Sequence, residues 1–208
     1  ELINLSIGEP KKRASKKVLS ILASNKELFS QYPPLGSMNI LVSAYKSYLS
    51  KRFNIKEVAN DNILNLGGTR EGTFSVIQSL FNKKIKSKKP YVLMPNPFYQ
   101  IYGGATLLAG GISKQINLNE DNGFSLDLNS INENIWKKCQ IFVACSPSNP
   151  TGSVLKEDEI RKIIKLSRKY GFYIVSDECY IDIYRESKPK SFIEISYKQF
   201  RNFKNIVS

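Results

Sequence analysis

Apolar residues recur at helical spacing in the first quarter of the chain. The clearest set is Leu41, Ala44, Tyr45, Tyr48 and Leu49, which follow the i, i+3, i+4, i+7, i+8 pattern. This spacing predicts an amphipathic helix that ends near Phe53. Ahead of it we expect a short strand over residues 2–7 and a helix that Ser15 caps and that runs to Leu22. Residues 32–36 contain two prolines and are expected to form a loop.

From residue 63 onward, short apolar runs alternate with segments of helical spacing. The expected strands are residues 63–66, 91–94, 112–118, 141–145, 172–176 and the beginning of one at 205–208. The expected helices begin near Thr69, near Tyr99, near Ile131 and ahead of Ile160. Pro95 and Pro97 are expected to stop the second strand. This alternation is typical of an α/β fold with three αβα layers, in which helices cover both faces of a mostly parallel sheet.

Composition narrows the classes of chemistry. The chain has 208 residues, 41% of them hydrophobic, which suits one globular domain, or one domain and part of another. It contains no histidine, which excludes a Ser-His-Asp triad, a Cys-His dyad and His-ligated zinc, and we expect no metal. Three cysteines without a C-x-x-C pair favour a reducing, cytoplasmic setting. No apolar run approaches the ~20 residues of a membrane helix, and no signal peptide is visible.

The formal net charge of +13 raises the question of nucleic-acid binding. The densest basic clusters are residues 83–89 and 11–17. They could form a phosphate-binding patch, or they could be solvated lysines in connections between elements. We favour the second interpretation and expect no nucleic-acid partner, because no RNP, zinc-finger or helix-turn-helix signature accompanies the charge.

Four loops follow expected strands, and two of them contain residues that could bind a flat, anionic ligand. Ligands of parallel sheets bind at the carboxyl ends of the strands, where these loops lie. The pair Gly67-Gly68 enters a helix at Thr69, which offers free backbone N–H groups to a phosphate, although a plain tight turn has the same pattern. Tyr99 follows two prolines and could stack on a flat ring, although a single tyrosine is more often a core aromatic.

The other two loops offer an amide and a carboxylate. Asn149 stands between two prolines in the segment 146–152 and can donate to a ligand oxygen, or it can form an Asx turn. Asp177 follows a buried strand, where a carboxylate needs a cationic partner, although an Asp at this place can also cap a helix. Tyr180 lies three residues further on, on the same side if a helical turn starts here.

The strings S-P-S-N-P-T-G (146–152) and S-D-E-C-Y (176–180) resemble the two best-known signatures of the class I/II aminotransferases of fold type I, in the same order. The resemblance covers nearly the whole chain. Further strings resemble the N-succinyldiaminopimelate aminotransferases within that family: S-I-G-E-P-K, Q-Y-P-P-L-G-S, G-T-R-E-G, W-K-K-C-Q and the seventeen residues 94–110. The implied cofactor is pyridoxal 5′-phosphate, and the implied substrates are amino acids and oxo acids. For this subgroup they are glutamate and N-succinyl-2-amino-6-oxoheptanedioate of the diaminopimelate and lysine pathway.

The resemblance assigns roles to individual residues. Asp177 would pair with the pyridinium nitrogen and keep it protonated, so that the ring acts as an electron sink. Asn149 and Tyr180 would hydrogen-bond the ring oxygen, and Tyr99 would stack on the ring. The residues implied for the phosphate are Gly68, Thr69 and Arg70.

Tyr32 and Gly8 receive their roles from the resemblance alone. Tyr32 matches a family tyrosine that reaches the phosphate of the neighbouring subunit, which implies a homodimer. Gly8 would lie beside the substrate carboxylate, although an ordinary turn glycine has the same pattern.

The chain departs from the family at the Schiff-base lysine, which follows a later strand in an S-x-S-K motif. No lysine of this sequence matches that motif, and the family spacing places it about six residues past Ser208. We therefore expect a fragment without the catalytic lysine. Residues 1–36 would be an N-terminal segment of the small domain, and residues 37–208 an incomplete cofactor-binding large domain.

Three other interpretations stay open. Another amino-acid aminotransferase or a C–S lyase of the same fold would share these residues. A basic binding module and an inactive truncated remnant are the remaining alternatives.

Overall fold

The computed structural model describes residues 13–32, 38–82, 90–121 and 123–208. Its helices are α1 (Lys16–Ser24), α2 (Met38–Phe53), α3 (Thr69–Leu80), α4 (Ile101–Ala109), α5 (Glu133–Lys138), α6 (Glu157–Tyr170) and α7 (Phe192–Phe200). Short 3₁₀ turns cover Lys26–Ser30 and Asn60–Asn62. The strands are β1 (Tyr91–Asn96), β2 (Ile112–Asn117), β3 (Cys139–Cys145), β4 (Tyr173–Asp177) and β5 (Ile206–Val207).

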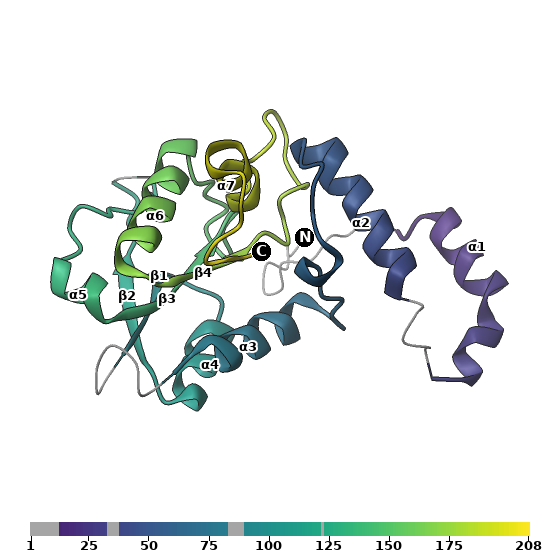
Figure 1. Ribbon diagram of the computed structural model, residues 1–208, viewed down its shortest axis with the longest axis horizontal. Helices are drawn as coiled ribbons and strands as arrows, with labels where there is room; N and C mark the ends of the chain where they lie inside the picture. Colours follow the sequence, from purple (N-terminus) through teal and green to yellow (C-terminus); the bar gives the residue numbers. More distant parts are fainter. Residues whose placement is uncertain (1–12, 33–37, 83–89, 122) are drawn as a thin grey trace, which may run out of the picture.

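The five strands form one sheet in the order β2-β1-β3-β4-β5, and all four neighbouring pairs are parallel. Helices α3 and α4 cover one face, and α5, α6 and α7 cover the other (Figure 1). The expected three-layer αβα architecture is therefore confirmed. Because β1 leads to β2 on one side and the chain then crosses to β3 on the other, the strand order reverses between β1 and β3. Ligands of such sheets bind near this reversal.

Two apolar cores fill the spaces between the layers. Between the sheet and α6, the ring of Trp136 stacks on Phe172 with centroids 5.4 Å apart, and Ile163 and Ile164 are fully buried beside it. On the other face, Ile77 of α3 and Tyr102 of α4 are fully buried against β1 and β3. Both faces of the sheet are thus covered, which explains why β3 reads as a continuous apolar run.

The prediction of a strand at residues 63–66 is wrong. The segment follows the 3₁₀ turn without forming a strand, and Leu64 and Leu66 are 79% and 51% exposed. A strand is defined by hydrogen bonds to a neighbour, and no other strand in the described part of the chain pairs with this segment. Its apolar residues therefore lie at the surface.

Pro95 does not stop β1, which continues to Asn96. The carbonyl of Asn96 accepts from Leu118 N at 2.8 Å, so the backbone groups of Asn96 face β2. Pro95 is one residue away and faces β3, where the pairing of β1 ends at Leu93. The missing N–H of the proline therefore costs no ladder hydrogen bond.

The other expected elements appear with small shifts. Helix α1 lies where a helix was predicted, although the Ser15 side chain makes no capping hydrogen bond. Helix α2 ends at Phe53 as predicted, but Leu41 is exposed while Val42 is buried. Helix α7 was not predicted. Its signal is Ser191, whose hydroxyl accepts from Ile193 N, followed by Glu194, which completes the Ser-x-x-Glu pattern of a helix start. The expected strand at residues 2–7 and most of the expected loop at 32–36 lie outside the described residues.

Ile163→Ala tests the core between α6 and the sheet. Ile163 is fully buried, so truncation removes apolar contacts and leaves a cavity. We expect the free energy of unfolding, measured by urea denaturation, to fall by about 2–5 kcal/mol. Ile183→Ala is the matched control, because Ile183 is 62% exposed, and it is expected to change stability by less than about 0.5 kcal/mol. Equal effects of the two substitutions would contradict the assigned core.

Candidate functional site

Asp177 lies at the carboxyl end of β4 and is held by neutral donors. The Tyr102 hydroxyl donates to its Oδ2 at 2.8 Å, and the Cys179 backbone N–H donates to its Oδ1 at 3.3 Å. Its own carbonyl accepts from Ser146 N at 3.1 Å, which ties it to the end of β3. No ion pair among the described residues includes Asp177. The carboxylate is partly buried, so a cationic group of a ligand would stabilise its charge.

The groups around Asp177 stay protonated at neutral pH. Burial raises the pKa of Tyr102 above its ordinary value of 10.0, and the Asp177 carboxylate, which accepts its hydrogen bond, raises it further. Burial, followed by the charge of Asp177, raises the pKa of Cys179 to about 12, and the pKa of Cys145 is raised by the same two causes. These thiols are therefore poor nucleophiles, because reaction requires the thiolate.

Tyr180 lies in the turn that follows Asp177. Burial raises the pKa of its hydroxyl, and the nearby Asp177 carboxylate raises it further. The phenol therefore remains a hydrogen-bond donor at neutral pH. The turn itself is closed by hydrogen bonds from Ile181 N to the Glu178 carbonyl and from Ile183 N to the Tyr180 carbonyl, each 2.9 Å long.

The beginning of α3 is an uncapped helix N-terminus. Gly68 is the N-cap residue and has no side chain to accept from the first backbone N–H groups, so those of Thr69 and Arg70 have no partner within the helix. These N–H groups and the helix dipole favour an anion. A Cβ at Gly67 would stand 2.8 Å from Oε2 of the exposed, flexible Glu71 side chain, and a Cβ at Gly68 would meet nothing within 4 Å.

The loop over residues 146–152 is fixed by its own hydrogen bonds. Ser148 N donates to the Ser153 carbonyl at 2.9 Å, Gly152 N donates to the Ser148 carbonyl at 2.8 Å, and Leu155 N donates to Ser146 Oγ at 3.0 Å. Asn149 is half-buried on this loop, and no hydrogen bond among the described residues uses its side-chain amide. The hydrogen-bonded loop therefore fixes the backbone of Asn149, and the side-chain N–H groups of Asn149 are available to a ligand.

Tyr99 packs against Tyr102, which in turn contacts Asp177. The ring of Tyr99 meets the ring of Tyr102 edge-on, with centroids 5.9 Å apart, and Tyr102 bonds the carboxylate directly. Tyr102 is the residue that sequence reasoning missed here. Its signal is the spacing of three residues from Tyr99 across the beginning of α4, which brings both rings to one side.

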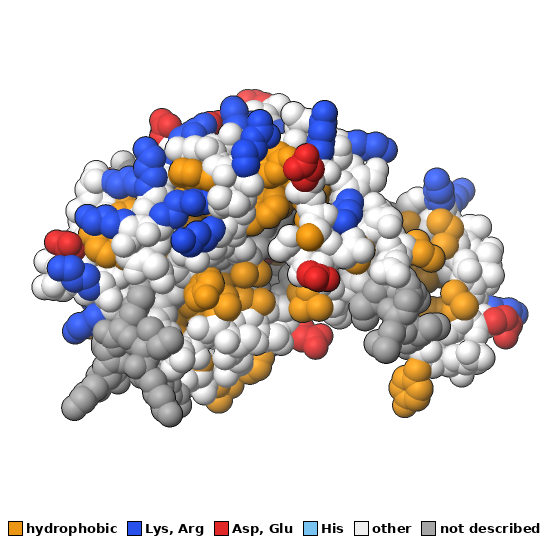
Figure 2. Space-filling view, viewed as in Figure 1, with side chains coloured by type: hydrophobic (Ala, Val, Ile, Leu, Met, Phe, Trp, Pro, Cys, Tyr) orange, Lys and Arg blue, Asp and Glu red, His pale blue; other side chains and the backbone are white. Residues whose placement is uncertain are grey.

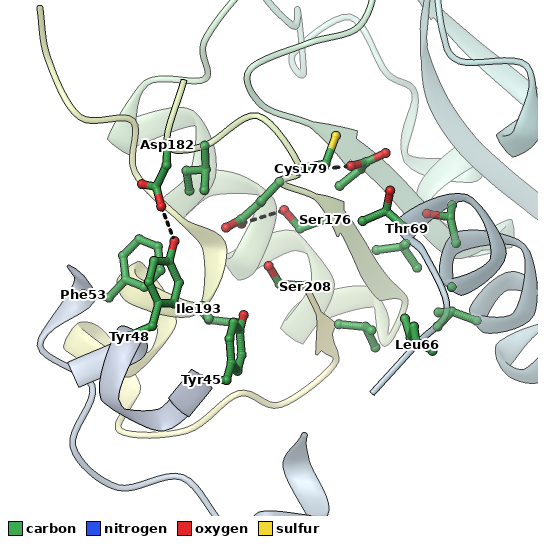
Figure 3. A pocket seen from close by; sticks show the side chains of 18 residues that line it. Tyr45, Tyr48, Phe53, Leu66, Thr69, Ser176, Cys179, Asp182, Ile193 and Ser208 are labelled. Atoms are coloured by element: carbon green, nitrogen blue, oxygen red, sulfur yellow. Dashed lines mark hydrogen bonds between the residues drawn. The ribbon is translucent and has the colours of Figure 1, made fainter. Parts of the chain in front are cut away.

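A cavity of about 520 Å³ opens beside Asp177 (Figure 3). Thr69 and Asp177 both line it, so the α3 N-terminus and the end of β4 face one space. Its opposite wall carries Tyr45, Tyr48 and Phe53 of α2. Hydrophobic side chains border the hollow on the surface in Figure 2.

Among the described residues that line the cavity, Thr69 and Asp177 are the only ones expected at the site. Tyr32 is 97% exposed, Arg70 is exposed on the first turn of α3, and Gly8 lies outside the described residues. Within the described residues, no group of three or more His, Cys, Asp and Glu side chains could hold a metal ion. None of the described helices is both long and apolar enough to span a bilayer. Lysine and arginine side chains are scattered over the side that carries α5, α6 and α7 (Figure 2).

The sequence profile described as "Aminotransferase class I and II" matches residues 1–204. An LL-diaminopimelate aminotransferase of Desulforudis audaxviator is 28% identical over 94% of this chain and 50% of its own length. A probable aspartate aminotransferase of Methanocaldococcus jannaschii is 32% identical over 90% of this chain and 48% of its own length. The crystal structure of an aminotransferase from Neisseria meningitidis superposes with a TM-score of 0.89 at 38% identity, over 99% of this chain and 52% of that one. The chain therefore spans about half the length of the relatives it matches.

Tyr102→Phe tests the hydrogen bond to Asp177 through the alkaline stability of the chain. A raised pKa in the folded state means that folding favours the protonated phenol. This stabilisation is complete below the ordinary pKa of 10.0 and is lost as the pH rises above it. We expect the unfolding free energy of the unchanged chain to fall more steeply between about pH 9 and pH 11 than that of Tyr102→Phe, by up to about 1.4 kcal/mol per pH unit. Tyr184→Phe controls for loss of a hydroxyl at an exposed position. Parallel curves for the unchanged chain and Tyr102→Phe would contradict the prediction.

Proposed function

The chain belongs to the class I and II aminotransferases, and from this premise we propose that it forms the cofactor-binding part of a longer aminotransferase. Members of this family depend on pyridoxal 5′-phosphate. The observation that carries the proposal is the Asp177 carboxylate, whose donors among the described residues are all neutral and which faces the same cavity as an uncapped helix N-terminus. A negative group and an anion site that share one cavity suit a ligand with a protonated ring and a phosphate.

Asp177 would hold the proton on the ring nitrogen of the cofactor. The described residues provide no cation for this carboxylate, so the protonated ring supplies the opposite charge that a partly buried carboxylate needs. When bound, the cofactor withdraws electrons from the substrate carbon that loses its proton. The hydroxyl of Tyr102 and the backbone of Cys179 orient the carboxylate for this contact.

The phosphate would bind at the beginning of α3. The backbone N–H groups after Gly68 and the hydroxyl of Thr69 are its donors, and the Arg70 guanidinium adds a positive charge. The structure supports Thr69 best, because it lines the cavity with Asp177.

Asn149, Tyr180 and Tyr99 would complete the contacts with the ring. The Asn149 amide and the protonated Tyr180 phenol are donors suited to the ring oxygen. Tyr99 would lie against the ring face. We assign covalent attachment of the cofactor to no lysine among residues 1–208, since none matches the S-x-S-K motif.

For substrates we propose glutamate and N-succinyl-2-amino-6-oxoheptanedioate. The sequence strings that resemble N-succinyldiaminopimelate aminotransferases support this choice, and so does the relative named for LL-diaminopimelate, which shares the diaminopimelate skeleton. Gly8 is proposed to lie beside the substrate carboxylate.

Assembly and domain division are further parts of the proposal. The exposed ring of Tyr32 is free to reach a second subunit, where it would contact the phosphate, so we propose a homodimer. Residues 1–36 are assigned to the small domain and residues 37–208 to the large domain. The three cysteines are unpaired, which suits the reducing setting of the cytoplasm.

Asp177→Asn tests cofactor binding on the chain of residues 1–208. Pyridoxamine 5′-phosphate is the probe, because its amine cannot condense with the many surface lysines. We expect its dissociation constant, measured by fluorescence titration, to rise about tenfold or more, since the contact with a charged carboxylate is lost. Asp121→Asn removes an exposed carboxylate and is the matched control. Failure of the unchanged chain to bind the probe, or unchanged binding by Asp177→Asn, would contradict the proposed function.

The substrate is tested on the longer protein that carries this chain. We expect glutamate to form from 2-oxoglutarate faster with N-succinyl-LL-diaminopimelate than with LL-diaminopimelate or aspartate. A preference for either of these would overturn the succinylated substrate. Cleavage of cystathionine without transfer to an oxo acid would assign the protein to the C–S lyases of the same fold.

A further inference from the structure

Glu178 stands between Asp177 and Cys179 and borders the cavity, yet the proposed function gives its carboxyl group no contact with the cofactor. Burial raises the pKa of this group, while hydrogen bonds from Ser191, Phe192 and nearby serines act in the opposite direction. A buried carboxyl group destabilises a fold unless donors satisfy it. The groups that donate hydrogen bonds to Glu178 therefore indicate its role.

One oxygen of Glu178 joins two elements that are distant in the sequence. Oε1 accepts from the Ser176 hydroxyl of β4 at 2.8 Å, the contact marked beside Ser176 in Figure 3. It also accepts at 2.9 Å from the backbone N–H of Phe192, the first residue of α7. The positive end of the α7 dipole favours a negative charge at this place. Glu178 thus attaches the end of β4 to the beginning of α7.

The residues that make this attachment flank Asp177 in the sequence. Ser176 precedes Asp177 and Glu178 follows it, so the hydrogen bond between their side chains spans Asp177 itself. The Cys179 N–H that orients the Asp177 carboxylate comes directly after Glu178. A change at Glu178 therefore alters the backbone that carries both Asp177 and one of its two donors.

We propose that Glu178 is a positioning residue, which holds the Asp177 carboxylate in place for the ring nitrogen by fastening the turn after β4 to α7. This inference rests on the proposed function, because it gives Glu178 a role that acts through Asp177. The proposal gives Glu178 no contact of its own with the ring or the phosphate.

The test compares substitutions in the chain of residues 1–208. The dissociation constants of pyridoxamine 5′-phosphate and of inorganic phosphate are measured for Glu178→Ala, Glu178→Gln and the control Glu186→Gln, whose site is exposed. Thermal unfolding is recorded for each variant to confirm that it is folded. Glu178→Gln keeps an acceptor oxygen for Ser176 and Phe192, and so it tests the role even where Glu178→Ala fails to fold.

We expect Glu178→Ala to bind pyridoxamine 5′-phosphate about tenfold more weakly and inorganic phosphate unchanged. Glu178→Gln should stay within about threefold of the unchanged chain, because its amide oxygen still accepts both hydrogen bonds. Glu186→Gln should bind both ligands as the unchanged chain does. In an Asp177→Asn background, Glu178→Ala should weaken binding of the ring compound no further, since the group it positions is gone.

Three results would overturn the inference while the proposed function stands. These are unchanged binding by Glu178→Ala, equal losses for Glu178→Gln and Glu178→Ala, and a full additional loss in the Asp177→Asn background. The proposed function fails separately if the unchanged chain does not bind pyridoxamine 5′-phosphate or if Asp177→Asn alone has no effect. In that case the role assigned to Glu178 fails with it.

Discussion

Asp177 carries a negative charge at the end of a strand whose three preceding residues are buried, and this charge affects the groups around it. Its two oxygens receive a phenol and a backbone N–H, both neutral. Neutral donors orient a carboxylate and reduce the cost of burying it, but they do not cancel its charge. A ligand that brings a cation, such as the protonated ring nitrogen of the proposed cofactor, would balance this charge.

The sheet brings the other groups of the proposed site toward this charge. Cys145, the last residue of β3, is in register with Asp177, so the loop that carries Asn149 begins beside the carboxylate. Tyr102 links the site to the core, since its ring fills the space between α4 and the sheet while its hydroxyl reaches Asp177. Helix α3 packs on the same face and points its N-terminus into the same cavity. Parallel strands make this convergence possible, because all their carboxyl ends lie at one edge.

Periodicity was enough to predict the layers and most elements, because burial on both faces gives strands such as β3 an unbroken apolar run. It failed where a partner decides the structure. Residues 63–66 have strand-like composition, but no strand in the described part of the chain pairs with them. The effect of Pro95 depends on which neighbouring strand its backbone faces. The site residues Asp177, Asn149 and Thr69 stood out by their place at strand and helix ends. Tyr102 and Glu178 did not, because their roles depend on hydrogen bonds to residues 75 and 14 positions away.

A carboxylate whose described donors are all neutral needs rigid surroundings, because hydrogen bonds and the backbone keep it in place. The turn after β4 meets this need with charged groups of its own. The largely buried Arg52 of α2 donates to Asp182 at 2.7 Å and to the Pro189 carbonyl at 3.2 Å, and Tyr48 donates to the second oxygen of Asp182. Glu178 fastens the beginning of the same segment to α7. Hydrogen bonds at Glu178 and at Asp182 thus hold this segment near both of its ends. The positions of the Asp177 carboxylate and of Tyr180 depend on these side chains, to which the proposal gives no contact with the ligand.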